Sequence, residues 1–269
     1  MSSSPSKPEH TLAGRTALIC GASRGIGRAT AMTFAQRGAR CVVLARSAEQ
    51  LRNLVATLPP PSRGDHSVLC ADMTDTEGLA ECLTRLQTSG HSIDIVINNT
   101  GGPAGGPLVE ARPEALLAAF RQHVLATQVM VTTLVHGMRE RRWGRFVNVL
   151  STSVRVPIPG LGVSNTVRSA MAAHAKTLAG ELAPFGITVN NILPGYTRTE
   201  RMESLAGEAA ARMGKSPVDI EAQWLAAVPM GRFADAAEIA EAIAFFASPA
   251  AGYITGQSLA VDGGRTGSI

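Results

Sequence analysis

The sequence predicts a doubly wound α/β fold, in which one parallel sheet carries helices on both faces. Short apolar runs of strand length alternate with longer helical stretches as far as residue 193. The runs are apolar on both faces, as in strands that helices cover on each side. A glycine-rich turn joins the first run to the first helical stretch, and no linker or internal repeat interrupts the alternation. These observations predict right-handed crossovers and a single domain.

The expected strands define the sheet. In chain order they are residues 16–20, 41–45, 67–71, 93–97, 145–150, 187–193 and a short final strand at 258–261. The expected helices between them are residues 25–37, 48–57, 76–89, 113–141 and 165–183. Pro113 suits the first turn of its helix, and Pro184 followed by Gly186 suits a helix end.

The alternation changes after the sixth expected strand. Residues 199–227 are polar, Ala-rich and only weakly periodic, which predicts small helices over the sheet edge. A segment beyond the carboxyl ends of parallel strands is where a substrate lid lies. Residues 235–247 are expected to form one further helix before the last strand.

The charge pattern argues against a nucleic-acid partner. The net charge of +4 is mild, and the basic residues are scattered. The one short cluster, Arg139, Arg141 and Arg142, stands at the expected end of a helix, where cations suit the negative end of the helix dipole. We therefore expect a small-molecule substrate and no nucleic acid as partner.

The cysteines and the N-terminal segment indicate a reduced, cytoplasmic protein without a metal. The four cysteines lack metal-ligand spacing, as do the His, Asp and Glu residues. No run of about 18 apolar residues exists, which argues against a membrane span. Residues 1–10 are rich in Ser and Pro and lack the apolar core of a signal peptide. We expect a disordered tail at 1–11, tolerant of deletion, and one domain at 12–269.

The glycine-rich turn has the form of a phosphate-binding loop. Its sequence, between the first expected strand and the first expected helix, is Gly21-Ala22-Ser23-Arg24-Gly25-Ile26-Gly27. The first glycine allows the tight turn, the second lets backbone amides approach a pyrophosphate, and the third lets helix and strand pack closely. The helix N-terminus then attracts the anion. The strand–turn–helix context predicts a dinucleotide site, whereas a glycine triplet outside such a context serves packing alone.

The residues after the second expected strand select between NAD(H) and NADP(H). NAD sites usually place an acid there to hold the ribose 2′-hydroxyl. Here the segment is Leu44-Ala45-Arg46-Ser47, which contains no acid. Arg46, assisted by Arg24, has the guanidinium fork that suits a 2′-phosphate; the alternative is that both are solvated surface arginines. We predict NADP(H) as the cofactor.

These residues resemble the short-chain dehydrogenase/reductase family, especially its 3-oxoacyl-carrier-protein-reductase-like members. The similarity extends from about Leu12 to Gly264. Besides the glycine loop, it is carried by Asp72 after the third strand, Asn98-Asn99-Thr100-Gly101 after the fourth, Pro194-Gly195-Tyr196-Thr197-Arg198-Thr199 after the sixth, and the C-terminal residues 253–264. The resemblance implies a Rossmann-like, seven-stranded sheet of order 3-2-1-4-5-6-7 and a homodimer or homotetramer.

The resemblance also implies where the cofactor lies. Asp72, with Met73 next to it, is expected beside the adenine. The remaining contacts are expected from the loops after the fourth and sixth strands, at Asn99, Gly101, Pro194, Gly195, Thr197 and Thr199. Thr100 stands where the family usually has Ala.

The catalytic positions depart from the family pattern, which is Asn, Ser, Tyr and Lys, with the last two in a Tyr-x-x-x-Lys turn. In the family the tyrosine gives a proton to the substrate oxygen, the lysine holds the nicotinamide ribose, and the serine hydrogen-bonds the substrate oxygen. Alignment of the motifs places Ser151 at the serine position, Ser164 at the tyrosine, Arg168 at the lysine and His123 at the asparagine. This pattern resembles an atypical subgroup with Ser-Asn-x-x-Arg in place of Tyr-x-x-x-Lys.

The changed residues limit the possible chemistry. Ser164 cannot inherit the role of a tyrosine, because its hydroxyl is a weaker acid and sits further from a substrate. Arg168 donates hydrogen bonds rather than protons, so it binds the ribose or a substrate carboxylate or oxyanion. His123 is the best remaining titratable group, unless it is a satisfied core histidine. Ser151 is either a substrate-binding hydroxyl or a strand-end cap.

Three functions are compatible with these residues. The first is an NADP(H)-dependent oxidoreductase for a small-molecule carbonyl or alcohol, in which Ser151 and Arg168 polarise the substrate oxygen and water or His123 supplies the proton. A substrate with its own acidic group needs less help. The second is a non-redox lyase, isomerase or cyclase on the same scaffold. The third is a catalytically inactive NADP(H)-binding subunit.

Overall fold

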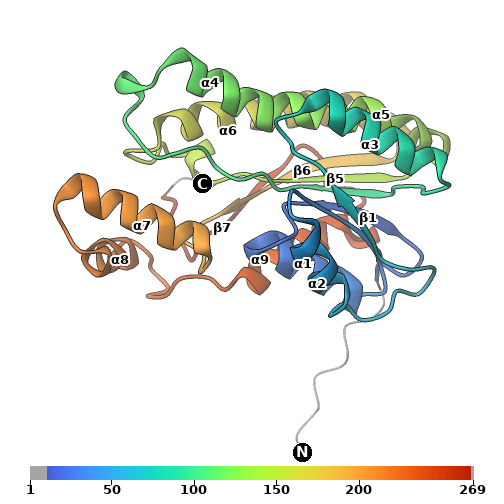
Figure 1. The fold of residues 1–269 in the computed structure, drawn as a ribbon, viewed down its shortest axis with the longest axis horizontal. Coiled ribbons are helices and arrows are strands. Elements are labelled where there is room, and N and C mark those ends of the chain that lie inside the picture. The colour runs from blue at the N-terminus through green and yellow to red at the C-terminus, as the bar shows by residue number, and fades with distance from the viewer. Residues whose placement is uncertain (1–10, 268–269) are drawn as a thin grey trace, which may run out of the picture.

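A sheet of seven parallel strands runs through the centre of the protein (Figure 1). The computed structural model describes residues 11–267. The strands are β1 (Thr16–Cys20), β2 (Arg40–Ala45), β3 (Ser67–Cys70), β4 (Ile95–Asn98), β5 (Gly144–Val149), β6 (Ile187–Pro194) and β7 (Ser258–Val261). Their order in the sheet is β3-β2-β1-β4-β5-β6-β7. The predicted fold class, single domain and strand order are therefore confirmed.

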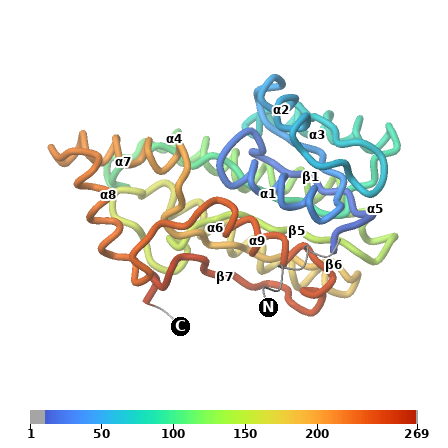
Figure 2. Tube along the Cα trace, turned by 90° about the horizontal axis from the view of Figure 1, so that it is seen from below, coloured from blue at the N-terminus to red at the C-terminus, as the bar shows by residue number. Residues whose placement is uncertain are grey.

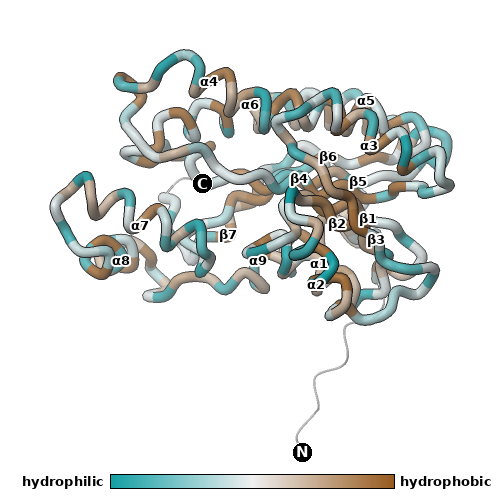
Figure 3. Tube along the Cα trace, viewed as in Figure 1, coloured by the Kyte–Doolittle hydropathy of each residue, from teal (hydrophilic) through white to brown (hydrophobic). Residues whose placement is uncertain are grey.

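Helices cover both faces of the sheet. One face carries α1 (Gly25–Gln36), α2 (Ala48–Val55) and α9 (Ala236–Ala247), and the other carries α3 (Thr76–Thr88), α5 (Ala126–Glu140) and α6 (Gly162–Leu182) (Figure 1). Side chains alternate between the two layers, so Ala17 and Ile19 of β1 pack in one core while Leu18 and Cys20 pack in the other. Because both faces are covered, most residues of the strands are hydrophobic, and β1 and β2 are the most uniformly so (Figure 3).

One predicted helix is not regular. The expected helix at 113–141 consists of α4 (Pro113–Phe120) and α5, joined by a π-helical turn, Arg121–Leu125. Within this turn the carbonyl oxygen of His123 accepts a hydrogen bond from the hydroxyl of Thr127. Such wide turns are frequent at functional sites. The prediction of one continuous α-helix was wrong here, because hydrophobic periodicity does not register one extra residue in a turn.

The segment after β6 also differs from its prediction. It forms two regular helices, α7 (Glu200–Met213) and α8 (Pro217–Ala226), which lie together at one end of the protein, beyond the sheet (Figures 1 and 2). Thr199 caps α7, and Ser216 opens α8 with a capping box. The buried residues that join the two helices are Ala206, Ala210 and Ile220. Since this small core is mostly alanine, its hydrophobic periodicity is weak.

Two further predictions concern the ends and the membrane. The expected tail at 1–11 lies outside the described residues, apart from the exposed Thr11. Within residues 11–267, no helix has both the length and the apolar character needed to cross a membrane.

Candidate active site

A cavity of about 1190 Å³ lies along the carboxyl ends of the strands. Its wall is built from the loops that follow β1 to β6 and from helices α7 and α8. In a doubly wound sheet this edge is where ligands bind. The volume exceeds the range of about 300–1,000 Å³ that is usual for one small ligand. The cavity therefore has room for a large ligand and a small one together.

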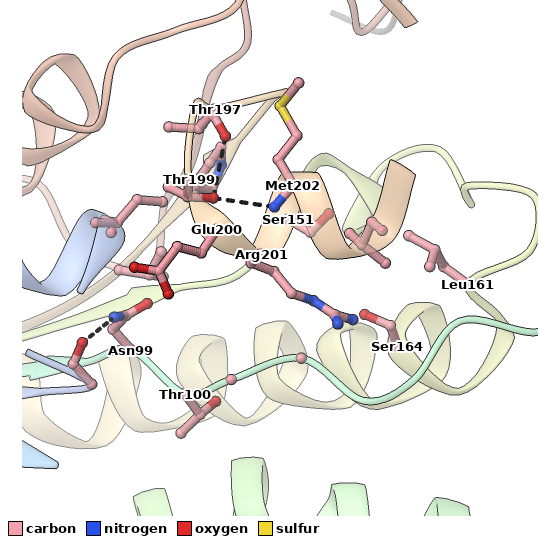
Figure 4. Close-up of a pocket in the computed structure, with 18 of the residues that line it drawn as sticks. Asn99, Thr100, Ser151, Leu161, Ser164, Thr197, Thr199, Glu200, Arg201 and Met202 are labelled. Carbon is pink, nitrogen blue, oxygen red and sulfur yellow. Dashed lines mark hydrogen bonds between the residues drawn. The ribbon is translucent and has the colours of Figure 1, made fainter. Parts of the chain in front are cut away.

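The glycine loop leaves no room for a side chain at Gly21 or Gly27. A Cβ atom on Gly27 would overlap the carbonyl oxygen of Gly21, and one on Gly21 would overlap the carbonyl oxygen of Asn99. The side-chain Nδ2 of Asn99 donates to the carbonyl oxygens of Cys20 and Gly21, both at 3.4 Å (Figure 4). These contacts tie the loop after β4 to the glycine loop and place the start of α1 at the cavity.

The N-terminus of α1 is open toward the cavity. Arg24 is its N-cap residue and makes no side-chain hydrogen bond to the first turn. Ser23, Gly25 and Ile26 line the cavity beside it. Uncapped N–H groups at the positive end of a helix dipole form an anion site. The loop therefore fits the pyrophosphate of a dinucleotide.

The other end of the dinucleotide site is formed by the loops after β2 and β3. Arg46 is exposed and lines the cavity, as do Asp72 and Met73. The N–H of Thr74 donates to Asp72 at 2.9 Å, and this bond, aided by the charge of Arg46, holds the pKa of Asp72 below its usual value. Arg24 is engaged elsewhere, because its Nη1 donates to Glu200 at the start of α7 at 2.7 Å.

Two of the altered catalytic positions lie one turn apart on α6. Nε of Arg168 donates to the hydroxyl oxygen of Ser164 at 3.2 Å. Its Nη1 donates to the carbonyl oxygens of Val149 and Leu150 at the end of β5, at 3.2 and 2.7 Å. Burial, together with the nearby charge of Arg201, lowers the pKa of Arg168 to about 10. The guanidinium is still charged at neutral pH, so it serves as a hydrogen-bond donor.

Ser151 has features of both roles that the sequence leaves open. Its hydroxyl oxygen accepts a hydrogen bond from the N–H of Ser153 at 3.1 Å, which caps the short turn after β5. The same side chain lines the cavity. Because the cap uses only the oxygen, the hydroxyl proton remains available to a ligand.

His123 lies behind the cavity wall. Its side chain is 2% exposed and does not line the cavity. Its Nδ1 is hydrogen-bonded to the hydroxyl of Thr100, and its Nε2 has no hydrogen-bond partner among the described residues. Burial, with a contribution from the charge of Arg168, lowers the pKa of His123 to about 3. The imidazole is therefore neutral at physiological pH.

The structure brings nearly all predicted site residues to one cavity. The loops after β4 and β6 contribute Asn99, Gly101, Pro194, Gly195, Thr197 and Thr199 to its wall. Only Gly27 and His123, of the residues predicted for the site, lie off the wall. Within residues 11–267, no group of three or more His, Cys, Asp or Glu residues is placed to hold a metal ion.

Sequence reasoning missed Arg201, on α7. Its Nη2 donates to the carbonyl oxygen of Pro103, and its Nη1 lies 3.5 Å from Oε1 of Glu208. The side chain reaches from α7 toward Ser164 on α6 (Figure 4). It belongs to the weakly periodic segment, where no local pattern distinguishes a cavity arginine from a solvated one.

Two aromatic side chains, Tyr196 and Trp224, form part of the cavity wall. The ring of Tyr196 stacks on Trp224 with centroids 5.0 Å apart, and Phe233 meets it edge-on at 6.0 Å. The guanidinium of Arg265 lies 4.7 Å from the Tyr196 centroid. Burial raises the pKa of Tyr196, so its phenol stays protonated at neutral pH. This side of the cavity combines apolar surface with several arginines.

The fold and the site define an α/β protein of the dinucleotide-binding class. The family described as enoyl-(acyl carrier protein) reductase matches residues 21–266. The chain belongs to the short-chain dehydrogenase/reductase family, as its motifs predict, and it is similar to 3-oxoacyl-carrier-protein reductases.

The relatives match over nearly the whole chain. The 3-oxoacyl-(acyl-carrier-protein) reductase FabG of Haemophilus influenzae is 32% identical over 251 residues, which are 93% of this chain and 98% of the relative. The solved structure of YwfH, an NADPH-dependent reductase involved in bacilysin biosynthesis, has a TM-score of 0.87 at 29% identity and covers 95% of this chain and 99% of its own. L-sorbose reductase of Gluconobacter frateurii, complexed with NADPH and L-sorbose, has a TM-score of 0.85 at 27% identity, with 98% and 100% covered.

Proposed function

We propose that the chain is an NADP(H)-dependent oxidoreductase that interconverts a carbonyl and an alcohol on a small molecule. The observation that carries the proposal is one continuous cavity, which joins the glycine loop and Arg46 to Ser151, Ser164 and Arg168. NADP(H) is the cofactor predicted from the sequence, and it is the cofactor named for YwfH and for L-sorbose reductase.

Different residues of the chain hold different parts of the cofactor. The open N-terminus of α1 holds the pyrophosphate, and the guanidinium of Arg46 holds the 2′-phosphate. Arg24 assists once it leaves Glu200, since an exposed ion pair is worth at most about 1 kcal/mol. Asp72 and Met73 flank the adenine, and the loop after β6 lies at the nicotinamide end.

The chemistry that NADPH supplies when bound is a hydride for the carbonyl carbon. Ser151 and Arg168 donate hydrogen bonds to oxygen atoms of the substrate, because both have donors at the cavity wall. The carbonyl oxygen takes its proton from water. We assign the proton to water rather than to His123, because that imidazole is neutral and lies behind the wall.

The test is NADPH consumption with a panel of small aldehydes and ketones, followed at the absorbance band of the reduced nicotinamide. We expect turnover that Arg168→Ala abolishes and Ser164→Ala retains, with NADPH fluorescence titration as the check that each variant is folded. If Ser164→Ala were the inactive variant, the assignment of roles would be wrong. Tight NADPH binding without turnover would favour a non-redox enzyme or an inactive binding subunit. No response to either dinucleotide would overturn the proposal.

Two further proposals concern the oligomeric state and the cellular compartment. We propose a homodimer or homotetramer, as the family resemblance implies. We also propose a reducing compartment such as the cytoplasm, since the cysteines Cys20, Cys41, Cys70 and Cys82 are free thiols. Burial raises the pKa of Cys20 and of Cys41 to about 12, which makes both thiols unreactive.

A further inference from the structure

Two arginines from different helices converge on the loop after β4. A methyl group placed on Gly102 would lie 3.5 Å from Nη2 of Arg168 and 3.5 Å from Nη2 of Arg201. Nε of Arg201 would lie 3.7 Å from the same point. The carbonyl oxygen of Pro103 takes one N–H of the Arg201 Nη2. The other N–H of that Nη2, the Nε of Arg201 and the Nη2 of Arg168 therefore present donors to one small region beside Gly102.

Arg168 lacks a negative partner in this region. It is 9% exposed, and among residues 11–267 its hydrogen bonds go to a serine hydroxyl and two backbone carbonyls, through Nε and Nη1. No described residue accepts a hydrogen bond from its Nη2. Keeping a buried guanidinium charged without a counter-ion, next to a second guanidinium, costs free energy that a bound anion removes.

The local charges balance a single negative charge. Arg201, whose side chain is 39% exposed, is paired with Glu208, whose carboxylate also accepts from Ser204 and from the N–H of Gly105. Arg168 and Arg201, set against this one carboxylate, leave one positive charge before Arg212 is counted. Arg212 lies beside the same carboxylate and helps to lower the pKa of Glu208, but its side chain is exposed, so solvent screens its charge.

We propose that Arg168 and Arg201 bind a carboxylate of the substrate, so that this enzyme acts on oxo acids or hydroxy acids. The inference rests on the proposed function only in placing the reacting carbonyl beside Ser151. A carboxylate matches the site better than a phosphate dianion, because it is planar, carries one charge and does not face Glu208 with a second one. Fork-shaped pairing with guanidinium groups is the geometry that carboxylates favour.

The carboxylate also compensates for the missing tyrosine. In the family that phenol orients the substrate oxygen as well as protonating it, and Ser164 is too short to do either. A second attachment point on the substrate restores the orientation, because binding energy from a non-reacting group can hold the reacting carbon in position. The two changes, loss of the phenol and gain of a cavity guanidinium on α6, are thereby explained together.

The binding test uses non-reducible acids and their amides. The NADP⁺-loaded protein is titrated by calorimetry with benzoate against benzamide and with hexanoate against hexanamide. We expect each acid to bind about ten-fold or more tightly than its amide, since hydrogen bonds between two charged groups are stronger than those to a neutral amide. We call the pair Arg168 and Arg201 the clamp. Equal or undetectable binding of acid and amide would contradict the proposal that the clamp binds a carboxylate.

Two variants change the clamp in opposite directions. Arg201→Gln removes one guanidinium and is expected to erase most of the preference for the acid. Glu208→Gln keeps one acceptor oxygen, enough for the N–H of Gly105, and removes the competing charge, so acid binding is expected to tighten several-fold. Arg85→Gln, which loses a similar exposed ion pair with Glu81 on α3, is the control and leaves the preference unchanged. A preference that survives Arg201→Gln, or that Glu208→Gln weakens, contradicts the proposal.

Turnover separates this inference from the proposed function. Paired substrates, an oxo acid and its methyl ester, are compared by NADPH consumption. The clamp predicts that the ester has a much lower kcat/KM and that Arg201→Gln narrows the difference. If the protein bound acids better than amides but consumed no NADPH, the carboxylate clamp would be supported and the proposed oxidoreductase function would be contradicted. If acid and ester were turned over at equal rates, the oxidoreductase function would be supported and the carboxylate clamp would be contradicted.

Discussion

Arg46 is the residue that we propose selects NADP(H) over NAD(H) in this chain. Its guanidinium lines the cavity after β2, at the position where an acid would hold a ribose hydroxyl. Arg46→Ala is expected to weaken NADPH binding by about ten- to hundred-fold, because one charge-assisted contact of about 1.5–3 kcal/mol is lost. NADH, which has no 2′-phosphate, should bind the variant as it binds the parent. Fluorescence titration with both dinucleotides measures this, with Arg52→Ala on the exposed side of α2 as control.

His123 makes stability depend on pH. Its pKa is about 3 in the folded protein against the ordinary value of 6.5, so the unfolded chain binds one more proton between these values. Stability therefore rises with pH in that window: the contribution is complete above pH 6.5 and is lost as pH falls toward 3. The limiting slope for one proton is about 1.4 kcal/mol per pH unit.

Replacing His123 isolates this effect. His123→Asn introduces the family residue, which does not titrate, so the variant should lose about one proton's worth of slope in urea unfolding between pH 4 and pH 6 (about 1.4 kcal/mol per unit at most). His136→Asn is the control, since His136 is exposed on α5. An unchanged slope in His123→Asn would show that the imidazole is not held neutral in the folded state.

Site residues that lie next to a strand end could be predicted from the sequence, and those that depend on contacts between distant segments could not. The glycine loop and Arg46 lie next to strand ends, and a strand end fixes where its loop goes. The burial of His123 depends on Thr100, from another loop, and on the fold of a π-helical turn. The place of Arg201 beside Arg168 depends on how α7 meets α6. Neither relation leaves a local pattern.

At the scale of elements, a row of three buried amides and one serine hydroxyl crosses four strands at one level of the sheet. Asn98 of β4 pairs in register with Asn148 of β5, which pairs with Asn191 of β6, and the last is opposite Ser258 of β7. The side chains follow the same path: Asn98 donates to Asn148 at 3.2 Å, Asn148 to Asn191 at 2.9 Å and Asn191 to Ser258 at 3.0 Å. In strands that read as hydrophobic, these polar side chains are buried because each finds a partner in the next strand.

Breaking this row in the middle should destabilise the sheet. Asn148→Leu keeps the branched shape of the side chain but leaves the Oδ1 of Asn191 without its donor, in a residue that is 2% exposed. A buried, unsatisfied polar group costs about 1–3 kcal/mol, which urea unfolding would measure as a lower midpoint with an unchanged slope. Asn53→Leu, on an exposed position of α2, is the matched control. A variant as stable as the parent would show that the row contributes nothing.

Element boundaries were predicted best where a cap or a strand of β-branched residues marks them. The Asp235–Glu238 capping box opens α9 one residue from its predicted start. By contrast, α6 starts at Gly162, three residues before its prediction, because the loop at Gly106 pairs with Leu161 and holds the chain there. That contact spans fifty-odd residues of sequence, so no window of local pattern reveals it.

At the scale of the whole molecule, the cavity joins segments that lie far apart in the chain. The glycine loop and α7 meet through the ion pair of Arg24 with Glu200, and Thr199 packs against Gly25. The glycine loop, Arg46 and Asp72 come from the first half of the sequence, whereas the loop after β6 and helices α6 to α8 come from the second. The strand order of the sheet brings these segments together at one edge. For this reason the motifs predicted which residues share the cavity, although they did not predict the substrate.

The outer surface of the molecule carries exposed apolar side chains in the segment between β4 and the start of α5. They are Leu108, Val109, Leu117, Phe120 and Leu125, exposed by between 39% and 92%. Exposed apolar side chains that cluster in one region mark protein contacts. Since the family resemblance implies a homo-oligomer, we expect a second copy of the chain to cover α4 and the start of α5 (Figure 1).

Light scattering of the purified protein should therefore give two or four times the mass of one chain. Leu117→Glu changes a residue that is 69% exposed, so it leaves the fold of one subunit intact while placing a charge in the interface, and it should shift the mass toward one chain. Val218→Glu on α8, also on an exposed apolar residue (75%), is the control and should leave the mass unchanged. If Leu117→Glu kept the parent mass, the copies would meet through another surface; if the parent itself were a single chain, the proposed assembly would be wrong.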